Sequence, residues 1–265
     1  MSDDRIDPLE LDLRPEVPHS ARIWNFWLGG KDHYLADEEL GRRVTEGYPQ
    51  AQTLARASRA FQDRAVRYLT RERGLRQFLD LGTGLPTVMP THRSAQEEAP
   101  AARVVYVDND PIVLTHARAL LTSSPEGATA YVDADLRDED SVLAAAADTL
   151  DLAQPVGLLC LSTLGHTRAA EGAELMQRYM ARLVPGSHLV ICDTIRTPET
   201  LRAEELYASG DTPPYWCREP REIEACAHGL ELMPPGLAPI NRLVVDGRPA
   251  GPDVDQWGLV AVKPA

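Results

Sequence analysis

FLDLGTGLP, at positions 78–86, is the stretch that decides the fold of this chain. Its apolar start closes on Asp80, and two glycines, Gly82 and Gly84, follow within four residues. Glycine lacks a Cβ atom, so the backbone can turn tightly there and come close to a ligand. The dinucleotide-binding fingerprint GxGxxG needs a third glycine, but Thr87 stands at that position, which disfavours a pyrophosphate ligand. We therefore expect a strand and a tight turn, which either binds a ligand or simply leads into the next helix.

Apolar runs that close on a polar residue recur further along the chain. Four of them are RVVYVDND with Asp108, TAYVDAD with Asp135, VGLLCLS with Ser162 and HLVICD with Asp193. Stretches of helical composition lie between them, at 111–121, 138–152 and 169–183. Such alternation predicts βαβ units and a mainly parallel sheet. Right-handed crossovers gather the carboxyl ends of the strands at one edge, so we expect the acids where ligands of open α/β sheets bind.

The two ends of the chain differ from this central pattern. Residues 1–19 contain three prolines and many acids, which predicts a flexible tail. Residues 36–73 are helical in composition, with apolar residues at steps of three and four after position 50. Toward the C-terminus, the composition of 198–228 predicts a helix with a break, and LELMPPGL and WGLVAVKPA predict two final strands, which we expect to be antiparallel. We predict one domain over 20–265, with a helical cap at 20–73 and a core at 74–265.

Composition narrows the class of protein. A net charge of −13 over 265 residues argues against nucleic acid or an anionic membrane as a partner. The four cysteines lack the spacing of metal ligands, so we expect no metal. The acidic N-terminus resembles no signal peptide, and no run reaches the roughly 20 apolar residues that span a bilayer. We expect a cytoplasmic protein with a small-molecule partner, and a homodimer is one possible assembly.

The predicted strand ends carry the groups that an adenosine ligand needs. A carboxylate at Asp108 can accept two strong hydrogen bonds from ribose hydroxyls, and Asn109 can face the purine. On the next strand, Asp135 can accept from an exocyclic amine, and Leu136 offers an apolar contact to the base. Each acid also has an ordinary explanation, which for Asp135 is capping of the helix that begins nearby.

With these motifs together, the chain resembles a class I S-adenosylmethionine-dependent methyltransferase. FLDLGTGLP, VVYVDNDPIVLTHARALL, YVDADLRD and LVPGSHLVICD carry the resemblance. More narrowly, ARIWNFWLGGKDHYLAD and RQFLDLGTGLPT are similar to an actinobacterial family with an LLGGKDN-type N-terminal motif, formerly of unknown function. The resemblance implies bound S-adenosylmethionine and a Rossmann-like seven-stranded, mostly parallel sheet with helices on both faces and an N-terminal helical cap.

The resemblance also assigns residues to the cofactor. It implies that Gly82, Thr83 and Gly84 hold the amino-acid part, that Asp108 holds the ribose, and that Asp135 meets the adenine amine. We place Asp80 and Ser162, which close neighbouring strands, in the same site. Gly29-Gly30 would let the cap turn over the sheet edge, so that Lys31 or a neighbour approaches the cofactor carboxylate while Trp24, Phe26 and Trp27 anchor the cap. Arg59, on a predicted helix, could neutralise a carboxylate of the cofactor or the substrate.

Methyl transfer needs few catalytic groups, because alignment of the nucleophile with an activated methyl supplies much of the rate. A general base is required only for weak nucleophiles such as hydroxyls. His166, His33 and Tyr34 are our catalytic candidates, although a histidine is often only a surface or capping residue. Tyr215 and Trp216 could line the pocket, with ordinary packing as the alternative, and for Trp216 we favour packing.

Three functions stay open at this point. The first is methyl transfer to a small molecule of unknown identity. The second is an S-adenosylmethionine-binding protein with a regulatory or non-catalytic role, suggested by TLGHT and VMPTHRS, which differ from the usual family sequences. The third, an NAD-dependent oxidoreductase, is weakened by the missing third glycine and the lack of a Tyr-x-x-x-Lys pair.

Overall fold

The structure is a computed structural model that describes residues 14–86, 89–110, 112, 113, 115, 122–210, 212–244 and 250–265. The predicted helix at 111–121 lies mostly outside the described residues, and so does Thr87 of the glycine turn.

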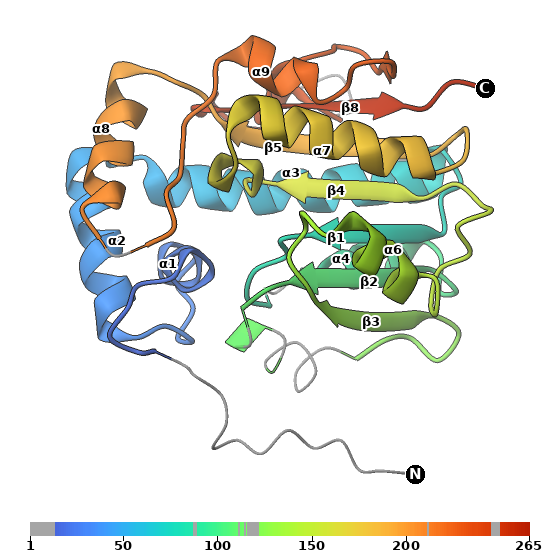
Figure 1. Cartoon of the computed structure of the whole chain (residues 1–265), viewed down its shortest axis with the longest axis horizontal. Coiled ribbons are helices and arrows are strands. Elements are labelled where there is room, and N and C mark those ends of the chain that lie inside the picture. The colour runs from blue at the N-terminus through green and yellow to red at the C-terminus, as the bar shows by residue number, and fades with distance from the viewer. Residues whose placement is uncertain are drawn as a thin grey trace.

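A mostly parallel sheet forms the centre of the molecule (Figure 1). Its strands are β1 (Gln77–Leu81), β2 (Arg103–Asp108), β3 (Ala128–Asp133), β4 (Gly157–Leu161), β5 (His188–Thr194), β6 (Glu231–Leu232), β7 (Ala238–Pro239) and β8 (Gln256–Val262). The order is β3-β2-β1-β4-β5-β8-β6, and β7 also pairs with β8. Strands β1 to β5 are parallel, whereas β8 runs antiparallel to β5. The predicted Rossmann-like fold is confirmed.

The eighth strand does not widen the sheet beyond seven positions. β6 pairs with β8 at Ala261 and Val262, and β7 pairs with β8 at Trp257 and Gly258. One edge of β8 pairs with β5. The two short strands β6 and β7 therefore follow one another along the opposite edge of β8. The two final strands predicted from the sequence correspond to β6 and β8, and they are antiparallel as expected.

Helices cover both faces of the sheet. Their bounds are α1 (Ser20–Trp27), α2 (Leu35–Gly47), α3 (Ala51–Glu72), α4 (Thr91–Glu98), α6 (Glu139–Ala146), α7 (Ala169–Arg182), α8 (Pro198–Ala208) and α9 (Pro220–Ala225), with short 3₁₀ turns η1 (Leu164–His166) and η2 (Ile240–Arg242). On β1, Leu79 and Leu81 pack with α6, α7 and α9, whereas Phe78 packs with α3, α4 and η2. Side chains alternate between the two faces of a strand, so a strand such as β1, with buried apolar residues on both faces, requires helices on both sides.

The helical cap sits over the edge to which the parallel strands point (Figure 1). Its core contains Ile23 and Trp27 of α1, Leu40 of α2, Leu54 of α3 and Tyr207 of α8, and Trp24 and Phe26 pack against them. The aromatic residues of α1 thus anchor the cap. Helix α8, which follows β5 in the chain, packs against α2 and completes a cap that we had predicted from residues 20–73 alone.

The start of the cap also differs from the prediction of a loose tail up to residue 19. His19 is the N-cap of α1, and its backbone N–H donates to Asp37 at 2.8 Å. Asp37 is fully buried and lies 3.3 Å from the Arg22 Nε atom. Arg22 in turn donates to the Val17 carbonyl at 2.5 Å. Residues 17–19 are therefore joined to the cap by buried polar contacts.

Candidate active site

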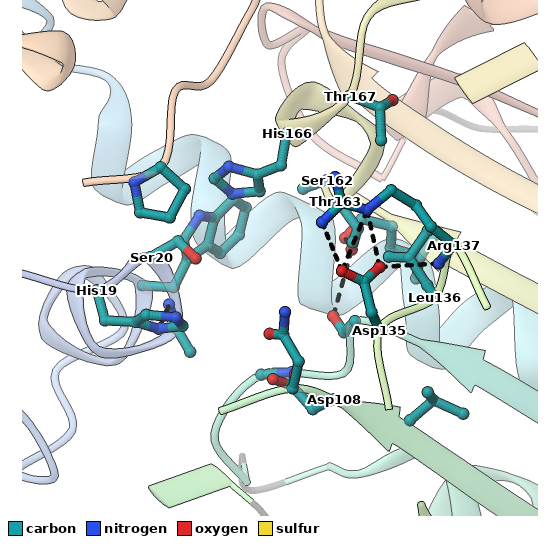
Figure 2. A pocket seen from close by; sticks show the side chains of 18 of the residues that line it. His19, Ser20, Asp108, Asp135, Leu136, Arg137, Ser162, Thr163, His166 and Thr167 are labelled. Atoms are coloured by element: carbon teal, nitrogen blue, oxygen red, sulfur yellow. Dashed lines mark hydrogen bonds and ion pairs between the residues drawn. The ribbon is translucent and has the colours of Figure 1, made fainter. Parts of the chain in front are cut away.

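A cavity of about 440 Å³ opens at the carboxyl edge of the sheet, between the strand ends and the cap. The sheet contributes the glycine turn after β1 and the residues that follow β2, β3 and β4, and the cap contributes α1 and α3. Figure 2 shows His19 and Ser20 from α1 on one side, Asp135 to Arg137 on the other, and Asp108 and His166 between them. A volume of 300–1,000 Å³ is usual for small-molecule and cofactor sites.

The glycine turn forms one wall of this cavity. Gly82 and Gly84 have φ angles of +66° and +67°, which other residues rarely adopt. A Cβ atom on Gly82 would lie 2.3 Å from the Thr163 side chain, and one on Gly84 would lie 3.3 Å from Arg59 Nη2. Glycine is therefore required at Gly82 by conformation and by space. Thr83 does not line the cavity, and its carbonyl accepts from Arg59 at 3.2 Å.

Asp108 ends β2 and faces the cavity from below the turn. Its carboxylate accepts from the backbone N–H of Gly84 at 2.8 Å and from that of Asp110 at 3.0 Å. Burial raises the pKa of Asp108, and these two backbone donors partly offset the effect. A carboxylate has about four acceptor positions, so two stay available for ribose hydroxyls. Asn109 follows as an exposed residue and also lines the cavity.

Asp135 and Leu136 follow β3 and line the opposite wall. Arg137 holds both carboxylate oxygens of Asp135, with Nε at 2.9 and 3.1 Å, and this pairing lowers the pKa of the acid. Helix capping does not explain Asp135, because Asp138 is the N-cap of α6 and accepts from the Ser141 N–H at 3.2 Å. The structure thus leaves Asp135 at the cavity, where a ligand amine would compete with Arg137.

Asp80 lies behind the glycine turn rather than in the cavity wall. Its carboxylate accepts from Thr91 at 2.6 Å and from Gln62 at 3.4 Å, so it joins β1 to α4 and α3. Burial raises the pKa of Asp80 to about 6. Asp80 follows an apolar run, as Asp108 does on β2. The contacts of Asp80, however, are with buried side chains and not with the cavity.

Arg59 reaches the cavity from α3. It donates to the Gln62 amide oxygen at 2.9 Å and to the Thr83 carbonyl, but its Nε atom has no hydrogen-bond partner among the described residues. Burial lowers the pKa of Arg59, and the charge of Asp80 opposes this effect. A partly unsatisfied guanidinium of this kind suits a carboxylate ligand.

Ser162 closes β4 in an unusual backbone conformation. Its φ of +59° lies in the left-handed region, which is uncommon for a residue with a side chain. Its backbone N–H donates to the Cys192 carbonyl at 2.8 Å, and its hydroxyl accepts from the Gln256 amide and lies 3.4 Å from Ser58. Ser162 lines the cavity, so β5, β8 and α3 together hold a strained residue at the site.

His166 is the catalytic candidate that lies at the cavity (Figure 2). It ends η1, and its Nδ1 atom is 2.9 Å from the Pro214 carbonyl. A carbonyl only accepts, so Nδ1 carries the proton and a neutral imidazole keeps a lone pair on Nε2. Burial lowers the pKa of His166, which favours this neutral form. The Tyr215 ring meets it edge-on with centroids 5.2 Å apart.

The other two catalytic candidates and Lys31 lie outside the cavity, contrary to our expectation. Gly29, at φ +81°, turns the chain, but the Asn25 side chain then gathers the loop by accepting from the Asp32 N–H at 3.0 Å. His33 is 3.2 Å from the same amide oxygen and 3.9 Å from Glu38.

Lys31 and Tyr34, the other two candidates in this loop, differ in their surroundings. Lys31 is exposed. The Tyr34 ring packs on the Arg22 guanidinium, 5.1 Å from its centroid. Tyr34 also packs against the cluster that contains Leu85, next to the glycine turn, so the loop reaches the sheet edge there without lining the cavity.

Two lining residues differ from our sequence-based expectations. His19 pairs with Asp110 at 2.9 Å and brings the N-terminus of α1 to the cavity. Trp216, which we expected to be packing, lines the cavity with its ring 4.1 Å from the Arg168 guanidinium. His19 directly precedes Ser20 and an amphipathic stretch, a helix-start signal that could have drawn attention to it. Trp216 depends on the path of the loop after α8, for which the sequence holds no such signal.

The strand order, the antiparallel β8 and a cavity at the glycine turn are typical of methyltransferases with a Rossmann-like fold. The chain belongs to the S-adenosyl methyltransferase family, whose model matches residues 7–264. It is therefore an enzyme that depends on S-adenosylmethionine. The expectation from the sequence motifs is confirmed at this level, and the oxidoreductase hypothesis is not supported.

Solved structures agree with this assignment. The chain is 40% identical to a DUF574 family protein from Streptomyces avermitilis, with a TM-score of 0.88 over 95% of this chain and 100% of that one. It is 33% identical to a candidate methyltransferase from Thermobifida fusca, with a TM-score of 0.87 over 96% and 97% of the two chains. The plantazolicin methyltransferase, solved with SAH, shares the fold at 12% identity, with a TM-score of 0.51 over 92% and 95%. A search of curated proteins found no match. Among the described helices, none has the length and apolar character needed to cross a membrane.

Proposed function

We propose that this methyltransferase acts on a small molecule and that His166 accepts a proton from the group that becomes methylated. The observation that carries the proposal is the hydrogen bond from His166 Nδ1 to the Pro214 carbonyl, which leaves a lone pair on Nε2 at the cavity. S-adenosylmethionine supplies a methyl group on a positively charged sulfur, which becomes a neutral thioether as the bond to carbon breaks.

The residues of the cavity suit this cofactor. Gly82 and Gly84 keep the turn free of side chains, as contact with the cofactor's amino-acid part requires. The Arg59 side chain borders the cavity and would stabilise a carboxylate there. Asp108 keeps acceptor positions for the ribose, and Asp135 and Leu136 offer an acceptor and an apolar surface for adenine. Asn109 and Ser162 border the same space, whereas Asp80 and Thr83 support the turn from behind.

A base is useful here because a hydroxyl is a weak nucleophile at neutral pH. The proton on His166 Nδ1 is fixed by the Pro214 carbonyl, so Nε2 is the atom that takes a proton from the substrate. The lowered pKa of His166 keeps the imidazole neutral and ready to accept it. His33 and Tyr34, which lie outside the cavity, are no longer our candidates for this step.

The net charge of −13 and the cavity volume of about 440 Å³ favour a small molecule over nucleic acid. A regulatory role without catalysis is not favoured, because the family to which the chain belongs is one of methyltransferases. The actinobacterial origin, the cytoplasmic location, the single-domain boundaries and the homodimer stay predictions.

Replacement of His166 by Asn tests the proposal, because the Asn amide can still donate to the Pro214 carbonyl but provides no base. We expect an unchanged Kd for S-adenosylmethionine by calorimetry and a rate of methyl transfer that falls about 10²- to 10⁴-fold. The assay follows the transfer of labelled methyl into a fractionated metabolite extract.

His33→Asn is the matched control, since His33 lies outside the cavity, and it should retain the wild-type rate. A full rate in His166→Asn would refute the role of His166. Failure of the wild-type protein to bind S-adenosylmethionine at ~100 μM, a readily measurable affinity, would refute the proposed cofactor site.

A further inference from the structure

A second, smaller cavity of about 70 Å³ adjoins the first. Ser20, Trp24 and His166 line both cavities and form the boundary between them. The remaining wall is mainly aromatic and aliphatic, and includes Trp27, Val44, Tyr48, Leu54, Tyr207 and Tyr215. The cofactor residues line only the larger cavity, so the smaller one is separate space on the other side of the candidate base.

Three tyrosines contribute to this wall, and their hydroxyl groups differ. Tyr48 donates to Asp255 at 2.9 Å, and Tyr215 donates to Asp193 at 2.5 Å. The Tyr207 hydroxyl is buried and has no hydrogen-bond partner among the described residues. Burial raises the pKa of Tyr207, and the side chains of Thr212 and Ser20 near its hydroxyl offset this only in part.

An unpaired hydroxyl in an apolar cavity is unfavourable unless a ligand supplies its partner. The ring centroids of Tyr207 and His166 are 6.5 Å apart. The Ser20 side chain is close enough to the Tyr207 hydroxyl to lower the pKa of Tyr207. Ser20 and His166 both belong to the boundary between the cavities. The polar end of a ligand in the small cavity would therefore lie at this boundary, next to the larger cavity.

The charge of the wall restricts the ligand further. Glu204 is the one formally charged side chain among the described residues that line the small cavity, and one of its oxygens accepts from the Cys217 N–H at 2.7 Å. The wall offers no cation to bind an acidic group. The volume of about 70 Å³ is several times the roughly 10–15 Å³ that one water molecule requires, and it excludes a large polycyclic group.

We propose that the small cavity holds the ring of the methyl acceptor, and that the acceptor is a small, uncharged aromatic alcohol of the phenol class. Its hydroxyl accepts a hydrogen bond from Tyr207 and donates its own proton to His166 Nε2. This inference rests on the proposed function, because it places the acceptor next to the base that would take its proton.

Phenol and toluene are the probes for this site, because they differ only in a hydroxyl that replaces a methyl group. Each is titrated by calorimetry into the full chain saturated with S-adenosylhomocysteine, the demethylated cofactor. We expect wild-type protein to prefer phenol. Tyr207→Phe should weaken the binding of phenol about 2- to 10-fold, the effect of one hydrogen bond, and leave that of toluene unchanged.

Tyr131→Phe is the matched control. Tyr131 also has a buried hydroxyl without a partner, but it lies on β3 and lines neither cavity. It should bind both probes as wild type does. Ala203→Phe, which extends a ring from α8 into the small cavity, should reduce the binding of both probes at least tenfold.

Equal affinity of wild type for the two probes, no weaker phenol binding in Tyr207→Phe, or no effect of Ala203→Phe would each overturn the assignment. The binding of S-adenosylmethionine, measured on the same samples, separates this outcome from failure of the proposed function. If the cofactor binds and the probes do not, the phenol site is refuted and the methyltransferase proposal stands. Tyr207→Phe is nearly isosteric, so it provides the test even if Ala203→Phe does not fold.

Discussion

Asp80 shows how one buried residue can support a site without lining it. The carboxylate receives hydrogen bonds from Thr91 and Gln62 and lies directly beneath the glycine turn. In the sequence it looks like Asp108, because each acid closes an apolar strand. The register of the sheet separates them: Asp80 pairs with Tyr106, so Asp108 lies on the same face but two residues nearer the carboxyl edge, where the cavity opens.

The raised pKa of Asp80, about 6, predicts a pH-dependent stability. An acid whose pKa is higher in the folded than in the unfolded chain binds its proton more tightly when folded. The free energy of unfolding should therefore fall as the pH rises from about 4 to about 6, by about 3 kcal/mol for this group. Asp193, with a pKa also raised to about 6 by burial, adds to the same slope.

Urea unfolding of wild type and Asp80→Asn at several pH values between 4 and 7 measures this contribution. In the variant the free energy of unfolding should fall less steeply as the pH rises, because Asn does not titrate. The fall that remains should come from Asp193. An identical slope in the two proteins would show that Asp80 does not change its protonation state on unfolding.

At the scale of elements, α1 and the loop that follows it form one unit. The Asn25 side chain on α1 accepts from the Asp32 N–H, and the Gly30 N–H donates to the Asn25 carbonyl at 2.8 Å. A Cβ atom on Gly30 would lie 2.3 Å from the Asn25 amide, whereas one on Gly29 would meet nothing within 4 Å. The two adjacent glycines therefore have different roles. Gly30 provides space for Asn25, and Gly29 provides a positive φ angle.

This difference can be measured as stability. Gly30→Ala should lower the free energy of unfolding by about 1–3 kcal/mol, because it displaces a buried polar side chain from its hydrogen bonds. Gly29→Ala should cost about 1–2 kcal/mol, from the left-handed backbone alone. The readout is urea unfolding, with Asn25→Ala as a background in which the Gly30 effect should shrink.

Lys31→Ala is the control for the same loop. The Lys31 side chain is exposed and outside the cavity, so we expect no change in stability or in affinity for S-adenosylmethionine. Weaker cofactor binding in this variant would instead restore our original expectation that Lys31 approaches the cofactor carboxylate. A Gly30→Ala variant as stable as wild type would refute the role of Asn25.

The short turn η1 explains a local difference from related sequences. Gly165, in TLGHT, lies under the Tyr215 ring, and a Cβ atom there would come within 2.3 Å of that ring. Tyr215 is in turn fixed by its hydrogen bonds to Asp193 and Thr194. The glycine thus permits a tyrosine from a distant loop to pack edge-on against His166.

At the scale of the whole molecule, the cavity lies between two bodies of structure, the sheet edge and the cap. A ligand that contacts both stabilises the folded state by mass action. S-adenosylmethionine at about 100 times its Kd should raise the free energy of unfolding by about 2.7 kcal/mol. In a chain of this size each kcal/mol raises Tm by about 2–4 °C, so we expect a shift of about 5–10 °C.

Thermal unfolding of two aspartate variants tests which strand end is responsible for the shift in Tm that S-adenosylmethionine causes. Asp108→Asn should show a smaller shift than wild type at the same cofactor concentration, because it loses a charged acceptor for the ribose. Asp133→Asn should retain the full shift. Asp133 pairs with Asp108 in the sheet register, but it is exposed and lies outside the cavity. Equal shifts in both variants would contradict the role of Asp108.

The sequence by itself determined the layered fold and the part of the site that the sheet edge contributes. Apolar strands that alternate with helices require a buried parallel sheet, and the glycine turn and the acids after β2 and β3 fall at its carboxyl edge by topology. These features depend on local composition and on a general rule of connection, so they can be inferred without coordinates.

Only the tertiary structure decided which side chains reach the cavity from outside that pattern. It placed Lys31, His33 and Tyr34 outside the cavity, in a loop that Asn25 fixes at Asp32, and it brought in His19 and Trp216. It also put Tyr207 of α8 beside His166, 41 positions earlier in the chain, to border a second cavity. Contacts of this kind depend on the packing of helices distant in sequence, which local periodicity does not encode.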